Sequence, residues 1–184
     1  DYDTVVEWVC EAVEAGTAGL NIDVKLILSM NRHESVTIGE QVLQAAKDYA
    51  HRGVVGLDLA GQEDGFSSLP FRDLFVDAKN AGFGVTIHAG EWAGAESVRE
   101  AVETLDADRI GHGIRAVEDR ALLDLLRERG TVLEVCPTSN VQSGAVDNFA
   151  AHPLMPLFQH GVRTTINTDD PLICNVTMSD EIAQ

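Results

Sequence analysis

Residues 82–113 read GFGVTIHAGEWAGAESVREAVETLDADRIGHG and contain one strand–helix–strand unit. The β-branched run VTIH at 85–88 predicts a buried strand, and the weaker run RIGH at 109–112 predicts a second one. Between them, apolar residues recur at helical spacing: Val98, Ala101, Val102 and Leu105. The same order repeats along the chain, which predicts a parallel sheet with right-handed crossovers.

Six runs in the sequence predict strands, at 24–28, 54–59, 85–88, 109–112, 131–136 and 163–168. Glycine precedes several of them, at positions where a left-handed residue ends a helix: Gly53, Gly82, Gly130 and Gly161. Gly53 and Gly82 are separated by about the ~30 residues that one strand–helix module needs. The choice of fold at this point lies between a doubly wound sheet and a (β/α) barrel.

Most of these runs end in polar or ionisable residues: Asp58, His88, His112, the segment 138–140, and the pair Asp169 and Asp170. In a barrel the carboxyl ends of all strands meet at one mouth, so this pattern favours an α/β fold of the (β/α)8 TIM-barrel type. A complete barrel has eight strands and typically ~250 residues. We therefore predict that residues 1–184 form a single domain with about six of the eight units, the C-terminal three quarters of such a barrel.

The chain carries 13 Lys and Arg residues against 30 Asp and Glu residues, a formal charge of −17. Such a surface repels phosphate backbones and anionic lipid heads, and no cluster of cations offsets it, so we expect neither nucleic-acid nor membrane binding. No run of about 18 apolar residues is present that could span a bilayer. These features favour small-molecule chemistry.

Cys10, Cys136 and Cys174 form no CxxC pair, so we expect neither a disulfide framework nor a thiolate zinc finger, and a reducing cytoplasm fits best. The chain starts at Asp1, and no signal-peptide pattern follows. We therefore expect a piece of a longer, cytoplasmic protein.

The segment 88–91, His-Ala-Gly-Glu, gives the sharpest local signal for chemistry. An imidazole at a strand end is a good ligand for a divalent metal, and Glu91 could be a further ligand or a proton donor beside a bound water. His112 follows the next predicted strand and is flanked by glycines that permit close approach of a ligand. The alternative for either histidine is a hydrogen-bonded residue on the rim.

Asp169 and Asp170 follow the last predicted strand and repel each other unless a cation or a shared proton separates them. The alternative is an Asx turn with Asp170 before proline. The loop after residues 54–59 ends at Gly61 and offers backbone N–H groups, but no phosphate-binding glycine motif is present. Together these groups describe metal-assisted hydrolysis. The histidines outside this set are interpreted as surface or cap residues: His33, His51, His152 and His160.

Five segments occur in a fixed order: LDLAGQE (57–63), VTIHAGE (85–91), RIGHGIR (109–115), CPTSN (136–140) and INTDDP (166–171). In these segments the sequence resembles the adenosine deaminase family of metal-dependent amidohydrolases. The resemblance implies a (β/α)8 barrel that holds one zinc ion and acts on a small purine nucleoside as a monomer. The implied reaction is hydrolytic removal of the 6-amino group of adenosine or deoxyadenosine, with release of inosine or deoxyinosine and ammonia.

The resemblance also implies roles for single residues. His88 and Asp169 would bind zinc, Glu91 would donate a proton to purine N1, and His112 would orient and deprotonate the zinc-bound water. Zinc lowers the pKa of bound water toward ~7, so that hydroxide attacks at neutral pH. Free Glu ionises near ~4.3, so Glu91 must lie in a desolvated pocket to act as a protonated donor.

Three further contacts are implied by the same resemblance. Asp170 would contact the water and purine N7, Gly61 would donate its backbone N–H to purine N3, and Asp58 would support the loop.

The sequence departs from the family at its zinc ligands, because the family takes two more from an HxH pair on its first strand and no HxH occurs here. We therefore expect the functional protein to extend N-terminally by two strand–helix units, and this chain alone to bind zinc weakly. Two alternatives stay open: a deaminase of adenine or another 6-aminopurine, and a truncated, non-catalytic relative that binds purine. The HxE and PCxxC signatures of cytidine-type zinc deaminases are absent.

Overall fold

The computed structural model describes residues 2–184. Over these residues, parallel pairing joins six strands into one sheet, and the strands follow each other in chain order. They are β1 (Leu26–Asn31), β2 (Val54–Ala60), β3 (Gly84–Ala89), β4 (Arg109–His112), β5 (Val132–Val135) and β6 (Arg163–Ile166). A doubly wound sheet reverses its order at a switch point, whereas this one does not. The α/β fold with barrel-type winding predicted from the sequence is confirmed.

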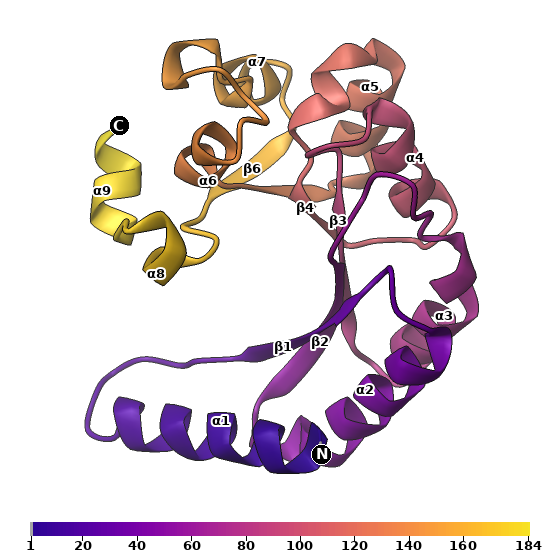
Figure 1. Ribbon diagram of the computed structural model, residues 1–184, viewed down its shortest axis with the longest axis vertical. Coiled ribbons are helices and arrows are strands. Elements are labelled where there is room, and N and C mark those ends of the chain that lie inside the picture. Colours follow the sequence, from indigo (N-terminus) through magenta and orange to yellow (C-terminus); the bar gives the residue numbers. More distant parts are fainter. Residues whose placement is uncertain (1) are drawn as a thin grey trace.

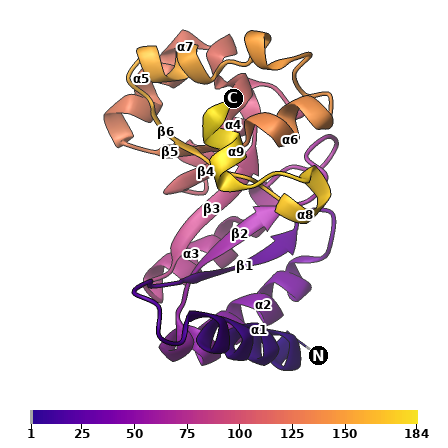
Figure 2. The same ribbon diagram turned by 90° about the vertical axis from the view of Figure 1, so that its left-hand side faces the viewer.

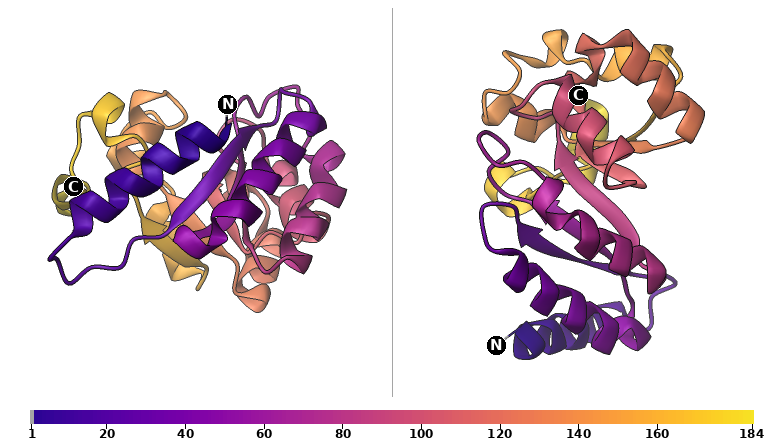
Figure 3. Two further views of the ribbon diagram at one scale, coloured as in Figure 1. Left: turned by 90° about the horizontal axis from the view of Figure 1, so that it is seen from below. Right: turned by 90° about the vertical axis from the view of Figure 1, so that its right-hand side faces the viewer.

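Most helices lie between successive strands and cover the outer face of the curved sheet, while the first precedes β1 and the last two follow β6 (Figures 1 and 3). The longer ones are α1 (Tyr2–Thr17), α2 (Val36–Tyr49), α3 (Arg72–Asn80), α4 (Ala95–Glu103) and α5 (Arg120–Arg129). The short ones are α6 (Pro137–Gln142), α7 (Leu154–Gln159), α8 (Pro171–Cys174) and α9 (Met178–Ala183). Single 3-10 turns are η1 (Ala50–Arg52), η2 (Leu69–Phe71), η3 (Ile114–Glu118) and η4 (Phe149–Ala151). Among residues 2–184, no helix has both the length and the apolar character needed to cross a bilayer.

The hydrophobic core lies between the outer helices and the sheet. The α4 stripe predicted from helical spacing is buried against the strands, with Val98, Ala101 and Val102 fully inaccessible. Strand residues such as Ile87 and Ile110 are equally buried. Burial of each such side chain stabilises the fold by roughly 1.5–3 kcal/mol. This layer fixes the strands, and through them the residues at their carboxyl ends.

The ends of the elements follow the sequence signals closely. The glycines predicted to end helices all have positive φ, at Gly53, Gly82, Gly130 and Gly161. Gly130, with φ +69°, ends α5 in the left-handed region, and its N–H bonds to the carbonyls of the last turn. At the other end, the Asp119 carboxylate accepts the N–H groups of Ala121 and Leu122. The chain therefore enters β5 at a sharply defined point.

The sheet has two free edges within residues 2–184, because no strand there pairs with the outer side of β1 or of β6. The gap between these edges faces the concave side of the molecule in Figure 1. α6 and α8 lie on the side toward which the arrowheads of β1 and β2 point (Figure 2). In a barrel of this type the active site lies at the carboxyl ends of the strands, so the predicted site is expected on this side of the sheet.

Candidate active site

Three of the predicted residues meet at the carboxyl ends of the strands. His88 from β3, His112 from β4 and Asp169 after β6 line one cavity of about 280 Å³, together with Glu134 and Cys136 from the β5 region. The two imidazole rings lie edge to face with their centroids 5.2 Å apart. The structure thus brings together side chains that are 24 to 81 positions apart in the printed sequence.

His88 is held by a carboxylate behind it. Its Nδ1 lies 2.8 Å from Oδ1 of Asp58, and the second Asp58 oxygen accepts a hydrogen bond from the Ser29 hydroxyl at 2.8 Å. Burial alone would lower the pKa of His88, but the hydrogen bond and charge of Asp58 outweigh it and raise the pKa. We expected Asp58 to support the loop, whereas it holds the imidazole itself. This arrangement leaves Nε2 of His88 directed away from Asp58.

Space for the His88 ring comes from the neighbouring strand. Gly111 pairs with His88 in the sheet, and a Cβ at Gly111 would lie 2.9 Å from the ring. Any other residue at position 111 would therefore displace the imidazole. The sequence suggested that the glycines beside His112 permit close approach of a ligand or a neighbouring strand. Gly111 does so, because it leaves room for the His88 ring on the neighbouring strand.

His112 and Asp169 both adopt left-handed backbone conformations, with φ of 61° and 59°. Such conformations cost on the order of 1–3 kcal/mol for residues other than glycine and gather at functional sites. Nε2 of His112 lies 4.0 Å from Oδ2 of Asp169, which accepts a hydrogen bond from the Ser139 hydroxyl at 2.7 Å. Burial, followed by the charge of His88, lowers the pKa of His112 to about 4. The ring is therefore neutral at pH 7.

Glu91 turns its carboxyl group toward the same place. One oxygen lies 3.4 Å from Nε2 of His112, and the other accepts from Asn140 and Ser143, each at 3.4 Å. Burial, followed by the negative charge of Asp169, raises the pKa of Glu91. This direction favours the protonated form that a proton donor needs at neutral pH.

The two remaining predicted residues lie at the border of this cluster. Oδ1 of Asp170 accepts the N–H groups of Leu172 and Ile173, each at 3.1 Å, so this carboxylate caps α8 in the way the alternative interpretation described. Gly61 follows β2 with φ +83°, and a Cβ there would lie 3.0 Å from Asn31 and His33. In the described part of the chain, neither residue contributes to the cavity lining.

Glu63 was missed by the sequence analysis. Its buried carboxylate accepts the successive N–H groups of Gly90, Glu91, Trp92 and Ala93, and so binds the whole turn after β3. The only signal for it was its place at the end of the LDLAGQE segment. Its partners come from a loop that is distant in sequence, and no local pattern reveals such contacts.

Arg32 holds the other end of the same turn. Its buried guanidinium donates to the carbonyl oxygens of His88 and, at 3.3 Å, of Phe66. Burial lowers the pKa of Arg32, and the charge of Glu63 opposes this shift. Arg32 and Glu63 therefore fix the path of the chain that carries both His88 and Glu91.

His152 corrects an interpretation made from the sequence. We expected a surface or cap residue, but the ring is buried and contacts Asn140, whose side chain is fully inaccessible. His152 lies in the short connection between η4 and α7, and no periodic pattern in this irregular segment could indicate that its ring is buried.

A divalent cation fits the chemistry of this donor set. Asp58 occupies Nδ1 of His88, as carboxylates do behind zinc-binding histidines, and Asp169 adds an oxygen in the same cavity. Donor atoms of His112, Cys136 and Asp169 also lie within 4.8 Å of one another. Burial, together with the surrounding carboxylates, raises the pKa of the Cys136 thiol, so the sulfur retains its proton. His88 is therefore the better ligand.

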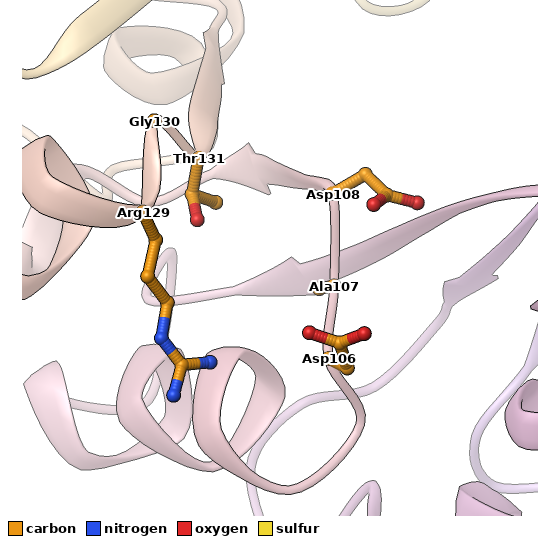
Figure 4. A pocket seen from close by; sticks show the side chains of 6 residues that line it. All are labelled: Asp106, Ala107, Asp108, Arg129, Gly130 and Thr131. Carbon is orange, nitrogen blue, oxygen red and sulfur yellow. The ribbon is translucent and has the colours of Figure 1, made fainter.

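A second hollow, of about 520 Å³, lies at the opposite ends of β4 and β5 (Figure 4). It is lined by the segments 106–108 and 129–131. Lys79 already forms ion pairs with Asp106 and Asp108 at 2.7 and 3.0 Å. Because the amino-terminal face of a barrel serves stability rather than chemistry, this hollow is not the candidate site.

Histidines and carboxylates gathered at the carboxyl ends of a barrel-type sheet are typical of metal-dependent hydrolases. Residues 1–184 match the family model for adenosine deaminase. The chain belongs to the adenosine deaminase family.

Known relatives of this chain are about twice as long as the chain itself. An adenosine deaminase from Erwinia tasmaniensis is 47% identical over 180 residues, which are 96% of this chain and 53% of that protein. An adenine deaminase from Arthrobacter aurescens has a TM-score of 0.92 at 32% identity, covering 100% of this chain and 56% of its own. An amidohydrolase from Burkholderia ambifaria with bound Zn gives 0.90 at 26% identity, covering 98% and 51%. The chain therefore spans about half the length of these relatives.

Replacing Glu63 by Gln should lower the free energy of unfolding by about 1–3 kcal/mol, because an amide N–H₂ group would face backbone donors that need an acceptor. Glu103→Gln is the matched control, since within residues 2–184 this exposed side chain pairs with Arg99 at i,i+4 spacing, and the substitution should cost less than about 0.5 kcal/mol. Urea unfolding of both variants measures the difference. Equal midpoints would show that Glu63 does not hold the turn.

Proposed function

We propose that this chain forms the larger part of the catalytic barrel of a zinc-dependent adenosine deaminase. The reaction is hydrolysis of adenosine or deoxyadenosine to inosine or deoxyinosine and ammonia, as in purine salvage. The observation that carries the proposal is the convergence of His88, Glu91, His112 and Asp169 around one cavity. The family membership and the 47% identity to a curated adenosine deaminase support it. We further propose a monomer in the cytoplasm.

His88 and Asp169 are the proposed zinc ligands. Each is oriented by a partner within the chain, His88 by Asp58 and Asp169 by the Ser139 hydroxyl. When bound, zinc would supply Lewis acidity that lowers the pKa of the attacking water toward neutrality. The left-handed backbone of Asp169 serves to aim its carboxylate back toward the cavity.

Glu91 is the proposed proton donor to purine N1. Burial and the charge of Asp169 raise the pKa of Glu91, which favours the protonated form, and the turn fixed by Glu63 holds the side chain in place. Protonation of N1 withdraws electrons from C6 and so favours attack by water. A carboxylate with an ordinary pKa of ~4.3 would have lost this proton.

His112 is proposed to orient the attacking water beside Glu91. Asp170 would contact the water and purine N7 through the oxygen that does not cap α8, and Gly61 would bind purine N3 through its N–H. The proposed contacts of Asp170 and Gly61 derive from the family motifs and require the substrate for their test.

The free edges of β1 and β6 support a longer functional protein. We propose that two further strand–helix units close the barrel and carry an HxH pair as the remaining zinc ligands. Apolar side chains near the gap are exposed, including Ile27 at 47% and Leu172 at 92%. Closure would bury such surface and remove both edges.

A second candidate is a deaminase of adenine or another 6-aminopurine. The structural similarity to an adenine deaminase at 32% identity favours it over other reactions. The proposed roles of these residues concern zinc, the attacking water and the purine ring, and none of them concerns the sugar. A non-catalytic purine-binding relative is the third candidate, and it predicts binding without turnover.

We expect the longer product of the reading frame, supplied with zinc, to release ammonia from adenosine, while this chain alone releases little. The reason is that the chain holds only part of the zinc shell. Parallel assays with adenosine, deoxyadenosine and adenine rank the substrates. A preference for adenine would favour the adenine deaminase. If neither protein released ammonia but both still bound purine, the non-catalytic relative would be favoured.

In the active protein, Glu91→Gln should reduce kcat by at least ~100-fold, because general acid catalysis contributes about 10²–10⁴-fold. Zinc content should be unchanged, since Glu91 is not a proposed ligand. Steady-state kinetics and metal analysis of the same sample test both statements. A rate near that of the unmodified protein would refute the proton-donor role.

In the longer, active protein, Asp169→Ala should remove a zinc ligand and lower the zinc content after purification. Asp147→Ala, at an exposed position outside the site, is the matched control and should retain the metal. Atomic absorption on both proteins measures zinc per chain. Equal zinc in the two variants would show that Asp169 is not a ligand.

A further inference from the structure

We propose that His152 and Asn140 are positioning residues that fix the tautomer of His112, with its proton on Nε2. The tautomer is read from hydrogen bonds within the chain, and its catalytic consequence rests on the proposed function. A chain of hydrogen bonds leads from a backbone amide, whose N–H can only donate, through buried side chains to the candidate active site.

The first step fixes the His152 ring. The backbone N–H of Leu154 donates to Nδ1 of His152 at 3.1 Å. An imidazole nitrogen that accepts a hydrogen bond carries no proton, so the proton of the neutral ring is on Nε2. Burial lowers the pKa of His152, which agrees with a neutral ring.

The second step fixes the Asn140 amide. Nε2 of His152 lies 3.2 Å from Oδ1 of Asn140, and a protonated Nε2 donates to that oxygen. The Asn140 side chain is fully buried, so water cannot replace this contact. Its N–H₂ group is therefore directed to the opposite side, toward the candidate active site.

The third step fixes His112. Nδ2 of Asn140 lies 3.1 Å from Nδ1 of His112 and 3.4 Å from Oε1 of Glu91. The two hydrogens of the amide serve these two acceptors. Nδ1 of His112 accepts, so the neutral ring carries its proton on Nε2.

The reversed orientation of the amide fails at His152. It would place Nδ2 of Asn140 against Nε2 of His152, which would then have to accept while Nδ1 also accepts from Leu154, leaving the ring without any proton. Exchanging donors and acceptors therefore leaves the network unsatisfied.

The consequence concerns what His112 does at the site. Its protonated Nε2 faces the Glu91 carboxyl group at 3.4 Å and Asp169 at 4.0 Å. In this tautomer Nε2 has no lone pair, so His112 orients an oxygen atom by donating a hydrogen bond and accepts no proton there. The family resemblance implies that His112 both orients and deprotonates the attacking water. In this tautomer only the orienting role remains.

The test is the tautomer itself, read by long-range ¹H–¹⁵N correlation NMR on the full chain with ¹⁵N-labelled histidine. Both His112 and His152 should show a protonated Nε2 and an unprotonated Nδ1 at pH 7. Signals are assigned by their loss in His112→Gln and His152→Gln. A protonated Nδ1 on His112 would overturn the proposal. This measurement is made on the unmodified chain, so it does not depend on whether a variant folds.

A variant tests the causal direction. In Asn140→Asp the carboxylate accepts from both rings, so the proton of His112 should move to Nδ1 while that of His152 stays on Nε2. Asn148→Asp is the matched control, because Asn148 caps η4 and does not contact His112. An unchanged His112 tautomer in folded Asn140→Asp would show that Asn140 does not set it.

Kinetics separate this proposal from the proposed function. In a protein that deaminates adenosine, Asn140→Asp should lower kcat at least ~10-fold with little change in KM, whereas a merely structural defect would alter stability alone. A confirmed tautomer without any deamination would refute the proposed function only. Deamination by a protein whose His112 carries its proton on Nδ1 would refute this inference only.

Discussion

Parallel pairing of the strands in chain order is the constraint on which the site depends, because it places every strand's carboxyl end on one side of the sheet. The register between β3 and β4 sets His88 opposite Gly111, and the absence of a side chain at Gly111 makes room for the imidazole. One step further along, Ala89 pairs with His112, whose left-handed backbone turns it out of the strand. A register slip of one residue would send these side chains to the other face.

A strongly acidic chain must compensate the charges it buries near this site. Glu63 is buried but accepts backbone N–H groups along a whole turn, and its charge opposes the lowering of the Arg32 pKa by burial. Nε of Arg32 is a buried atom without a hydrogen-bond partner in the described residues. Leaving such a donor unpaired costs about 1–3 kcal/mol. The position of Arg32 is thus held by its carbonyl contacts and by charge.

The sequence predicted those parts of the structure that follow local rules. β-branched runs located every strand to within a few residues, and strand-end residues such as His88 and Asp169 were placed together because barrel strands share one mouth. Glu63 received no role from the sequence, His152 was interpreted as a surface or cap residue, and Asn140 was noted only as part of a polar segment, because the contacts of all three are tertiary and leave no periodic signal. Asp58 was placed correctly at a strand end, but its partner, an imidazole 30 positions on, could be known only from the pairing of β2 with β3.

Two further strands could pair with the free edges of β1 and β6 in the described sheet. The groups present here are already oriented within the chain: His88 by Asp58, Asp169 by Ser139, and His112 by Asn140. Each of these contacts joins side chains that lie between β2 and the turn before α8, and none involves a further strand. Under the proposed function, further strands would supply the remaining metal ligands, while the orientation of these side chains is already set within this part of the barrel.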